Sequence, residues 1–227
     1  MRAPPDTLTL GETLFEQACA ATGIRYRRFR VAKVAGHKRP DYKVNIPDCG
    51  AIVEVKELVP NAQERRAAAE LAAGRMVGGT QTPGARLRRP IRSANEQLQQ
   101  ASLRGIPAAV AIFDTMFSLS YTDPYNVKVA MYGLDAIIMA LPDAGAPYRI
   151  GMKSAGKEVL TEKHNTSISA VVIIRGFPPS FDRVPLLFVY HNHFARVPLD
   201  PARLRSHVCE QFALGRADDG ATGWVAI

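Results

Sequence analysis

One short segment limits the possible folds of this chain more than any other. Residues 51–58, AIVEVKEL, form an almost continuous apolar run that contains Glu54 and Lys56. Such a run is typical of a central β-strand that is covered on both faces. Residues two apart point to the same face of a strand, so Glu54 and Lys56 share a face. Burial of a single charge is costly, and the two side chains are therefore expected to compensate each other, with further compensation of Glu54 from a metal ion.

Helix and strand patterns alternate through the first half of the chain. Thr9 and Glu12 have the spacing of a capping box, and Gly23 is a natural helix stop. The glycine- and proline-rich residues 74–90 are predicted to form a mobile loop. The elements predicted here are a helix from Thr9 to Gly23, strands over 24–34, 39–45 and 51–58, helices over 61–73 and 91–105, and a buried strand over 107–114.

The second half gives weaker patterns, in which strands dominate. The segment YTDPYN indicates a turn, residues 127–140 fit either a helix or a strand, and a hairpin is expected around Ser154–Gly156. Two late strands are predicted over 167–177 and 185–194, followed by a closing helix over 201–214. The whole pattern predicts an α/β layered fold with a mixed central sheet. We expect one domain spanning residues 1–227.

Composition narrows the class of protein further. The 227 residues carry a net charge of +8, which favours a polyanionic partner. The odd number of cysteines, Cys19, Cys49 and Cys209, argues against a disulfide scaffold. No signal peptide is recognised, and no apolar run is long enough to cross a membrane. We therefore expect a soluble, cytoplasmic protein without a membrane partner.

A second carboxylate precedes the apolar strand. Asp41 lies on the preceding predicted strand, and a short hairpin would bring it close to Glu54 at one end of the sheet. Two carboxylates in close proximity repel each other, and a divalent cation relieves that repulsion. Mg²⁺ commonly takes one or two protein carboxylates and keeps water or phosphate oxygens as its other ligands.

These residues resemble the core motif of the PD-(D/E)xK nuclease superfamily. Pro40-Asp41 matches the PD element, and Glu54-Val55-Lys56 matches (D/E)xK. Glu16 is similar to the first-helix glutamate of Mrr-like nucleases and Holliday-junction resolvases, and Gln97 to a glutamine on a later helix. The resemblance covers residues 11–114 and implies the three-layer restriction-endonuclease-like fold, a mixed central sheet flanked by helices. Residues 115–227 would add strands, a hairpin and the closing helix.

The resemblance implies a hydrolase that cuts phosphodiester bonds with Mg²⁺ or Mn²⁺. Asp41, Glu54 and the carbonyl of Val55 would hold the metal, and Glu16 would contribute directly or through a water. Lys56 would orient or deprotonate the attacking water, and Gln97 would position that water or the phosphate. Bound metal lowers the pKa of its water from about 15.7 toward neutrality. Many relatives are endonucleases that dimerise to cut two strands, which allows a homodimer here.

Two basic clusters are candidates for phosphate contacts. Such contacts supply affinity that does not depend on sequence and falls with salt. We expect a nucleic-acid partner, with DNA favoured over RNA. The predicted DNA-binding residues are Arg27, Arg28, Arg30, Lys38, Arg39 and Lys43 in the first cluster, with Arg25 and Lys33 beside them, and Arg86, Arg88 and Arg89 in the second, with Arg92.

Other interpretations remain open at this point. Glu54 and Lys56 also fit an exposed ion pair on an edge strand, Asp41 fits a turn, and Glu16 and Gln97 fit solvated helix positions. The same fold without catalysis would be a nucleic-acid-binding protein, and the basic surface would also suit a structural subunit. The motif formed by His191, His193, His207 and Cys209 only superficially resembles a zinc site.

Overall fold

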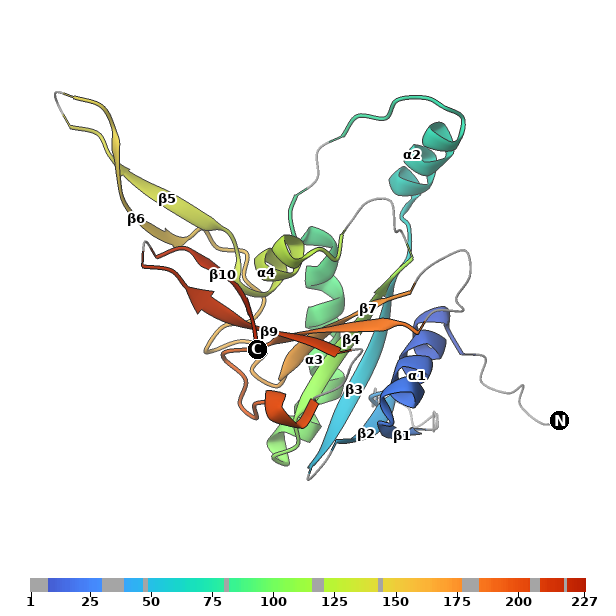
Figure 1. The fold of residues 1–227 in the computed structure, drawn as a ribbon. Coiled ribbons are helices and arrows are strands. Elements are labelled where there is room, and N and C mark those ends of the chain that lie inside the picture. The colour runs from blue at the N-terminus through green and yellow to red at the C-terminus, as the bar shows by residue number, and fades with distance from the viewer. Residues whose placement is uncertain are drawn as a thin grey trace.

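A single large sheet organises the molecule. The computed structural model describes residues 8–29, 39–46, 49–79, 82–115, 121–142, 145–176, 184–204, 209–218 and 220–227. The sheet has eight strands in the order β1-β2-β3-β4-β7-β8-β9-β10 (Figure 1). Its strands are β1 (Arg25–Arg28), β2 (Tyr42–Ile46), β3 (Cys49–Leu58), β4 (Ala108–Asp114), β7 (Ala170–Arg175), β8 (Leu186–His191), β9 (Cys209–Arg216) and β10 (Thr222–Ala226). The pairs β3–β4, β4–β7 and β8–β9 are parallel and the other pairs are antiparallel, so the sheet is mixed as predicted.

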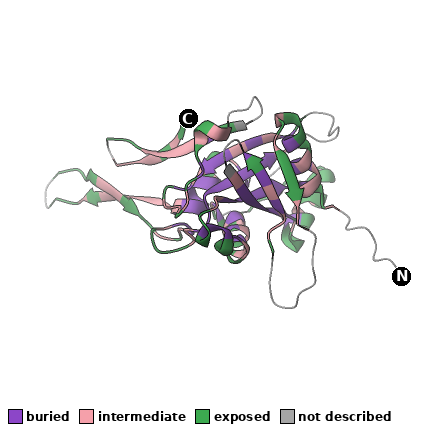
Figure 2. Cartoon of the chain, turned by 90° about the horizontal axis from the view of Figure 1, so that it is seen from below, coloured by how far each residue is buried: buried purple, intermediate pink, exposed green. Residues whose placement is uncertain are grey.

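Helices cover both faces of this sheet. On one face, α1 (Leu10–Thr22) packs Leu14, Phe15 and Ala18 against β3, β4 and β7. On the other face, α3 (Ala85–Leu103) and α4 (Pro124–Tyr132) form a second core with the opposite side chains of the same strands. The buried central strands between exposed helical surfaces are visible in Figure 2. The predicted α/β class with a mixed central sheet flanked by helices is confirmed.

The first helix begins and ends where its sequence predicts. Thr9 accepts a hydrogen bond from the backbone N–H of Glu12, and the Glu12 carboxylate accepts one from the N–H of Thr9, so the capping box is present. Gly23 follows the helix with φ +70°, a conformation that glycine adopts without a side-chain clash. The second predicted helix is α2 (Ala62–Ala72), which has Asn61 as its N-cap.

The apolar strand lies inside the sheet, as its composition predicts. β3 pairs with β2 on one side and with β4 on the other. Val53 and Val55 point into the core beneath α1, whereas Ile52 and Leu58 point into the core beneath α3. Glu54 and Lys56 therefore belong to the α3 face, because they alternate with Val53 and Val55.

The predicted loop over 74–90 is wrong in its second part. The helix α3 begins at Ala85 rather than at 91 and includes Pro90. Leu87, Ile91, Ala94 and Leu98 are fully buried along one side of this helix. That apolar packing holds the first turns in place although the proline lacks an N–H for the helical ladder.

The structure also corrects the second half of the chain. The segment YTDPYN is not a simple turn, because its second half begins a helix. Asp123 caps α4 (Pro124–Tyr132), and Pro124 is the first residue of that helix. The hairpin lies earlier than predicted: β5 (Asp135–Ala140) pairs with β6 (Tyr148–Ser154) in a separate two-stranded sheet. This hairpin extends away from the body of the molecule (Figure 1). The residues 127–140 are thus helix first and strand afterwards.

The predicted closing helix over 201–214 is wrong. Its first four residues form a short 3-10 turn, η2 (Pro201–Leu204). Residues from Cys209 onward form β9, which pairs in parallel with β8, and β10 then pairs with β9 at the sheet edge. Within the described ranges, no helix combines the length and the apolar character that crossing a bilayer requires.

Candidate metal-dependent active site

A lysine on β3 connects the strand to the neighbouring helix. The Lys56 ammonium donates to Glu54 Oε1 at 2.5 Å and to Gln97 Oε1 of α3 at 3.1 Å. The Gln97 amide in turn donates to the carbonyl of Arg39 at 3.2 Å. The Glu54 side chain is 3% exposed and the Lys56 side chain 26%. The cluster is therefore anchored in the sheet at Glu54 and open to solvent at Lys56, which excludes an exposed edge-strand ion pair.

Asp41 lies beside this cluster for a reason visible in the strand register. The pairing of β2 with β3 ends at Tyr42 and Val53, so Asp41 is one step beyond it. There the Asp41 carboxylate replaces the missing strand partner and accepts the N–H of Val55 at 2.8 Å. The predicted hairpin thus brings Asp41 to β3 next to Glu54.

Burial and the charge of Asp41 disfavour the ionised form of Glu54. Burial, and secondarily the charge of Asp41, raises the pKa of Glu54 to about 7, against an ordinary value of 4.5. Burial also raises the pKa of Asp41, while the hydrogen bond from Val55 acts in the opposite direction. The ammonium of Lys56 only partly offsets the effect on Glu54. The single positive charge of Lys56 therefore does not neutralise both carboxylates of the site.

The donor set suits a hard divalent cation. Glu54 Oε2 is buried and has no hydrogen-bond partner in the described part of the chain. The N–H and C=O of one strand residue point toward the same neighbour, so the Val55 carbonyl faces the side occupied by Asp41. An unpartnered carboxylate oxygen, a second carboxylate and a carbonyl are ligands that Mg²⁺ or Mn²⁺ accepts while it retains waters.

Glu16 is not brought to these residues. Its two carboxylate oxygens accept hydrogen bonds from Tyr26 at 2.9 Å and Tyr42 at 3.0 Å, and Arg28 lies 3.5 Å away. Tyr42 is completely buried, which ties Glu16 to the core on the α1 face. The described residues contain no group of three or more His, Cys, Asp or Glu side chains placed to hold a metal ion. Asp41 and Glu54 thus form a two-carboxylate site.

The carboxylate of α1 that acts on Asp41 is Glu12. Its charge contributes to the raised pKa of Asp41, whereas its side chain also completes the capping box at Thr9. Sequence reasoning assigned Glu12 only this capping role. The sequence feature that points to a second role for Glu12 is its spacing of four residues from Glu16, which places both carboxylates on the same side of the helix.

The strand register sorts the first basic cluster onto two faces. Arg27 pairs with Lys43, and Lys43 pairs with Ile52, so all three point to the face that carries Glu54 and Lys56. Arg25 shares this face because it lies two residues from Arg27. Arg28 points to the opposite face, where it meets Glu16. Arg39 is exposed beside Gln97, while Arg30, Lys33 and Lys38 lie outside the described residues.

The second basic cluster is only partly available to a ligand. Arg86 lies 3.0 Å from Glu64 and donates to the carbonyl of Val59, and Arg88 donates to the carbonyl of Pro83. Burial lowers the pKa of Arg88, and the nearby Arg92 adds to this effect. Arg89 and Arg92 are exposed, and together with Ser93 they line a surface hollow of about 420 Å³.

The two histidines of the suggested zinc motif that are described do not form a metal site. His191 hydrogen-bonds with Gln211 through Nε2, and burial lowers the pKa of its ring. His207 lies outside the described residues.

A comparison of the chain with protein-family models, curated proteins and solved structures gives no match. The geometry of the site is therefore the basis for any assignment of function.

Proposed function

We propose that this chain is a metal-dependent nuclease that hydrolyses phosphodiester bonds, with DNA as its substrate. The observation that carries the proposal is the unpartnered, buried Glu54 Oε2 beside Asp41, next to a lysine that reaches solvent. A carboxylate pair with raised pKa values that adjoins a partly exposed ammonium is a candidate functional site. The resemblance of Pro40-Asp41 and Glu54-Val55-Lys56 to the PD-(D/E)xK motif supports the same assignment.

Each residue has a role that follows from its contacts. Asp41, Glu54 and the Val55 carbonyl would hold Mg²⁺ or Mn²⁺, which supplies an acidified water and charge neutralisation when bound. Lys56 is a hydrogen-bond donor at a fixed position, because Glu54 and Gln97 hold its ammonium from two sides. It is thereby placed to orient a water and to stabilise negative charge on a phosphate oxygen. Gln97 is a positioning residue for Lys56.

The basic residues on the face of Lys56 would bind the substrate backbone. Lys43 lies on β2, next to β3, and Arg25 and Arg27 lie on β1, the next strand outward. All three share the face of Glu54 and Lys56. Phosphate contacts by arginine and lysine position a nucleic acid without reading its sequence. We therefore expect cleavage with little sequence preference.

The test is a cleavage assay of wild type and the Lys56→Met variant on plasmid DNA, single-stranded DNA and RNA. Methionine retains the apolar stem of the lysine but removes its charge. We expect wild-type cleavage of DNA with Mg²⁺ or Mn²⁺, loss of cleavage with EDTA, and at least about a hundredfold slower cleavage by Lys56→Met. The double variant Glu54→Gln, Lys56→Met serves as a second inactive form without an unpaired buried charge.

A matched control is Lys163→Met, which changes an exposed lysine on a distant loop. It should cleave at the wild-type rate. Equal cleavage by wild type and Lys56→Met, or cleavage that EDTA does not stop, would contradict the proposal. Salt-dependent DNA binding without any cleavage would instead identify a nucleic-acid-binding protein.

A further inference from the structure

The two edges of the large sheet differ in charge. At one edge, β1 carries three arginines among its four residues. At the other edge, β10 and the residue that follows it, Ile227, have no charged side chain. Charged residues on an edge strand hinder its pairing with another chain, and an uncharged edge lacks this protection. Because no described strand pairs with the outer side of β10, that edge is open to a further strand.

The pairing of β10 with β9 shows which backbone groups of β10 point outward. Ile227 donates its N–H to a carbonyl of β9 at 3.0 Å. Bonded and non-bonded pairs alternate along an antiparallel ladder, so Gly223 and Val225 also face β9. The N–H and C=O groups of Trp224 and Ala226 therefore point away from β9, toward the open edge.

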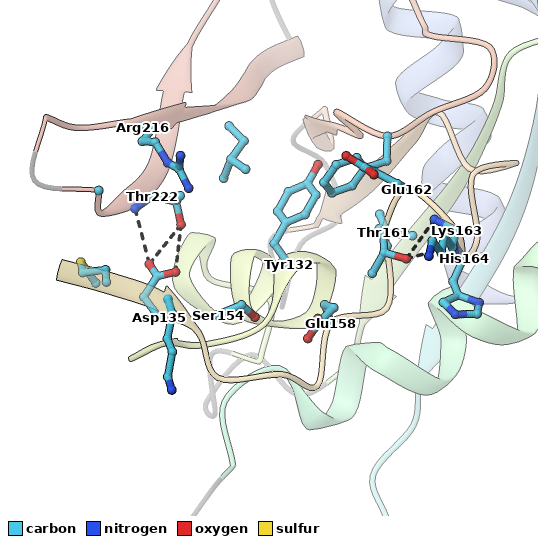
Figure 3. Close-up of a pocket in the computed structure, with 16 residues that line it drawn as sticks. Tyr132, Asp135, Ser154, Glu158, Thr161, Glu162, Lys163, His164, Arg216 and Thr222 are labelled. Carbon is cyan, nitrogen blue, oxygen red and sulfur yellow. Dashed lines mark hydrogen bonds between the residues drawn. The ribbon is translucent and has the colours of Figure 1, made fainter. Parts of the chain in front are cut away.

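The first residue of β10 is already engaged at this edge. The backbone N–H of Thr222 lies 3.4 Å from Asp135 Oδ2, and the Thr222 hydroxyl donates to the same oxygen at 3.0 Å (Figure 3). Asp135 is the first residue of β5, so the β5–β6 hairpin closes this end of the edge. The residues open to a new strand are therefore 223–227.

The side chain of Trp224 holds β10 in place from one face. Its indole N–H donates to the carbonyl of Pro124 in α4 at 2.8 Å. Its ring centroid lies 4.8 Å from that of Tyr190 and 5.9 Å from that of Tyr132. The edge is thus fixed before any partner binds, which lowers the entropy that association costs.

The other face of β10 is apolar and uneven. Val225 is 54% exposed and Ile227 55%. Gly223 shares this face, because it lies two residues from Val225, and no atom lies within 4 Å of a Cβ built on it. A large apolar side chain at one end and a vacant position at the other complement the same strand running in the opposite direction.

We propose that β10 pairs antiparallel with β10 of a second copy in a two-fold symmetric dimer. A register centred on Val225 places the outward backbone groups of Trp224 opposite those of the partner's Ala226. In this register each Ile227 covers the partner's Gly223, and the two Val225 side chains meet on the axis. Such an interface is isologous, since one patch is complementary to itself. The same pairing through β1 would bring arginines together, which disfavours the other edge.

The dimer would join two sheets without uniting their candidate active sites. With about 4.8 Å between strands, the two Glu54 side chains would lie on the order of 50 Å apart along the continuous sheet. The interface adds no residue to either site, so cleavage does not require it. A pair of five-residue strands is a small contact, and we expect a weak dimer with a Kd on the order of 10–100 μM.

The first test is sedimentation velocity of the full chain from about 1 to 300 μM, which spans the expected Kd. Val225→Lys puts two like charges on the axis and should raise the Kd about tenfold or more. Val59→Lys is the matched control: this valine is 64% exposed and lies outside the sheet, and its change should alter the Kd by less than about twofold.

A second variant removes an outward hydrogen bond instead of adding charge. Ala226→Pro lacks the N–H that points to the partner and leaves the ladder with β9 intact, since proline is tolerated where the N–H of an edge strand faces outward. It should sediment as a monomer over the same range. Far-UV circular dichroism of both variants should match wild type.

Cross-linking tests the register itself. Opposite residues of a non-hydrogen-bonded pair have Cα atoms about 4.5 Å apart, within the range of a disulfide. Val225→Cys should therefore form a covalent dimer on mild oxidation, whereas Val59→Cys and wild type should remain monomeric on a non-reducing gel. A monomeric wild type, an unchanged Kd in Val225→Lys, or equal cross-linking of the two cysteine variants would overturn the proposal. None of these measurements uses DNA or metal, so their outcome is independent of the nuclease assay.

Discussion

At the scale of single residues, the Glu54 carboxylate is buried but only partly neutralised by its neighbour Lys56. It is 2% exposed, so its charge is costly, yet Lys56 contacts only one of its oxygens. Burial raises its pKa to about 7, and in the metal-free protein the carboxyl is therefore half protonated near neutrality. A divalent cation would reverse this preference, because it binds the ionised form.

This position predicts how the stability of the metal-free protein depends on pH. The folded state holds the Glu54 proton more tightly than the unfolded state, whose pKa is near the ordinary 4.5. Stability is therefore full below about pH 4.5 and falls as pH rises toward about 7. The fall should reach at most about 3 kcal/mol in the free energy of unfolding, measured by urea titration in EDTA.

The Glu54→Gln variant provides the comparison for that measurement. Its stability should lack most of the fall between about pH 4.5 and 7, since glutamine does not titrate. Above about pH 7, added Mg²⁺ should stabilise wild type and leave the variant unchanged. An identical pH dependence in both proteins would show that Glu54 ionises normally.

At the scale of elements, the start of α3 depends on its contact with α4. Gly84 precedes α3 with φ +68°, and its N–H donates to Asn126 Oδ1 of α4 at 2.7 Å. A Cβ on Gly84 would lie 2.6 Å from the backbone nitrogen of Ala130, which leaves no room for any other residue. The two helices thus meet through a glycine at the start of α3.

Substitution of Gly84 should destabilise the protein more than substitution of Gly74, which has a similar φ but no close neighbours. Gly74 has φ +73° and no atom within 4 Å of a built Cβ, so Gly74→Ala should cost only the left-handed strain of roughly 1–2 kcal/mol. Gly84→Ala adds the clash with Ala130, which should bring a further loss of about 1–3 kcal/mol. Urea unfolding of both variants measures the difference, and equal losses would show that α3 and α4 move apart without cost.

At the scale of the whole molecule, the sheet divides the basic charge between its two faces. The net charge of +8 alone only indicates an attraction to polyanions. Adjacent residues of β1 illustrate the division: Arg27 is exposed on the face of Lys56, whereas Arg28 is held by Glu16 on the α1 face. Among the described residues of this cluster, Arg25, Arg27 and Lys43 lie on the face that carries the candidate active site.

These two arginines give a test of where DNA binds. The affinity for DNA should fall with salt, and Arg27→Ala should reduce the slope of log K against log salt by about 0.9 for the lost phosphate contact. Arg28→Ala removes the same charge from the opposite face and should leave this slope unchanged. Fluorescence anisotropy with a labelled duplex at several salt concentrations measures both variants. Equal slopes for the two variants would place the DNA elsewhere.

The local sequence determined much of the first half of this protein. The capping box at Thr9, the N-cap at Asn61 and the apolar run around Glu54 act over a few residues, so their elements could be predicted. The clustering of Asp41, Glu54, Lys56 and Gln97 could also be predicted from the motif. The resemblance likewise suggested Glu16, but the local pattern did not show that two tyrosines would hold that side chain.

Only the tertiary structure decided the remaining features. Residues from Cys209 to Leu214 fit a helix by themselves, but they form strand β9. Without β9, the backbone N–H and C=O groups along one edge of β8 would lack partners, and the pairing of β9 with β8 satisfies them. The first turns of α3 form through Pro90 because Leu87 and Ile91 are buried against the sheet. The face on which each arginine lies follows from strand register, which is set by pairing between distant segments. Long-range pairing and burial outweigh weak local preferences, and a single stretch of sequence does not contain them.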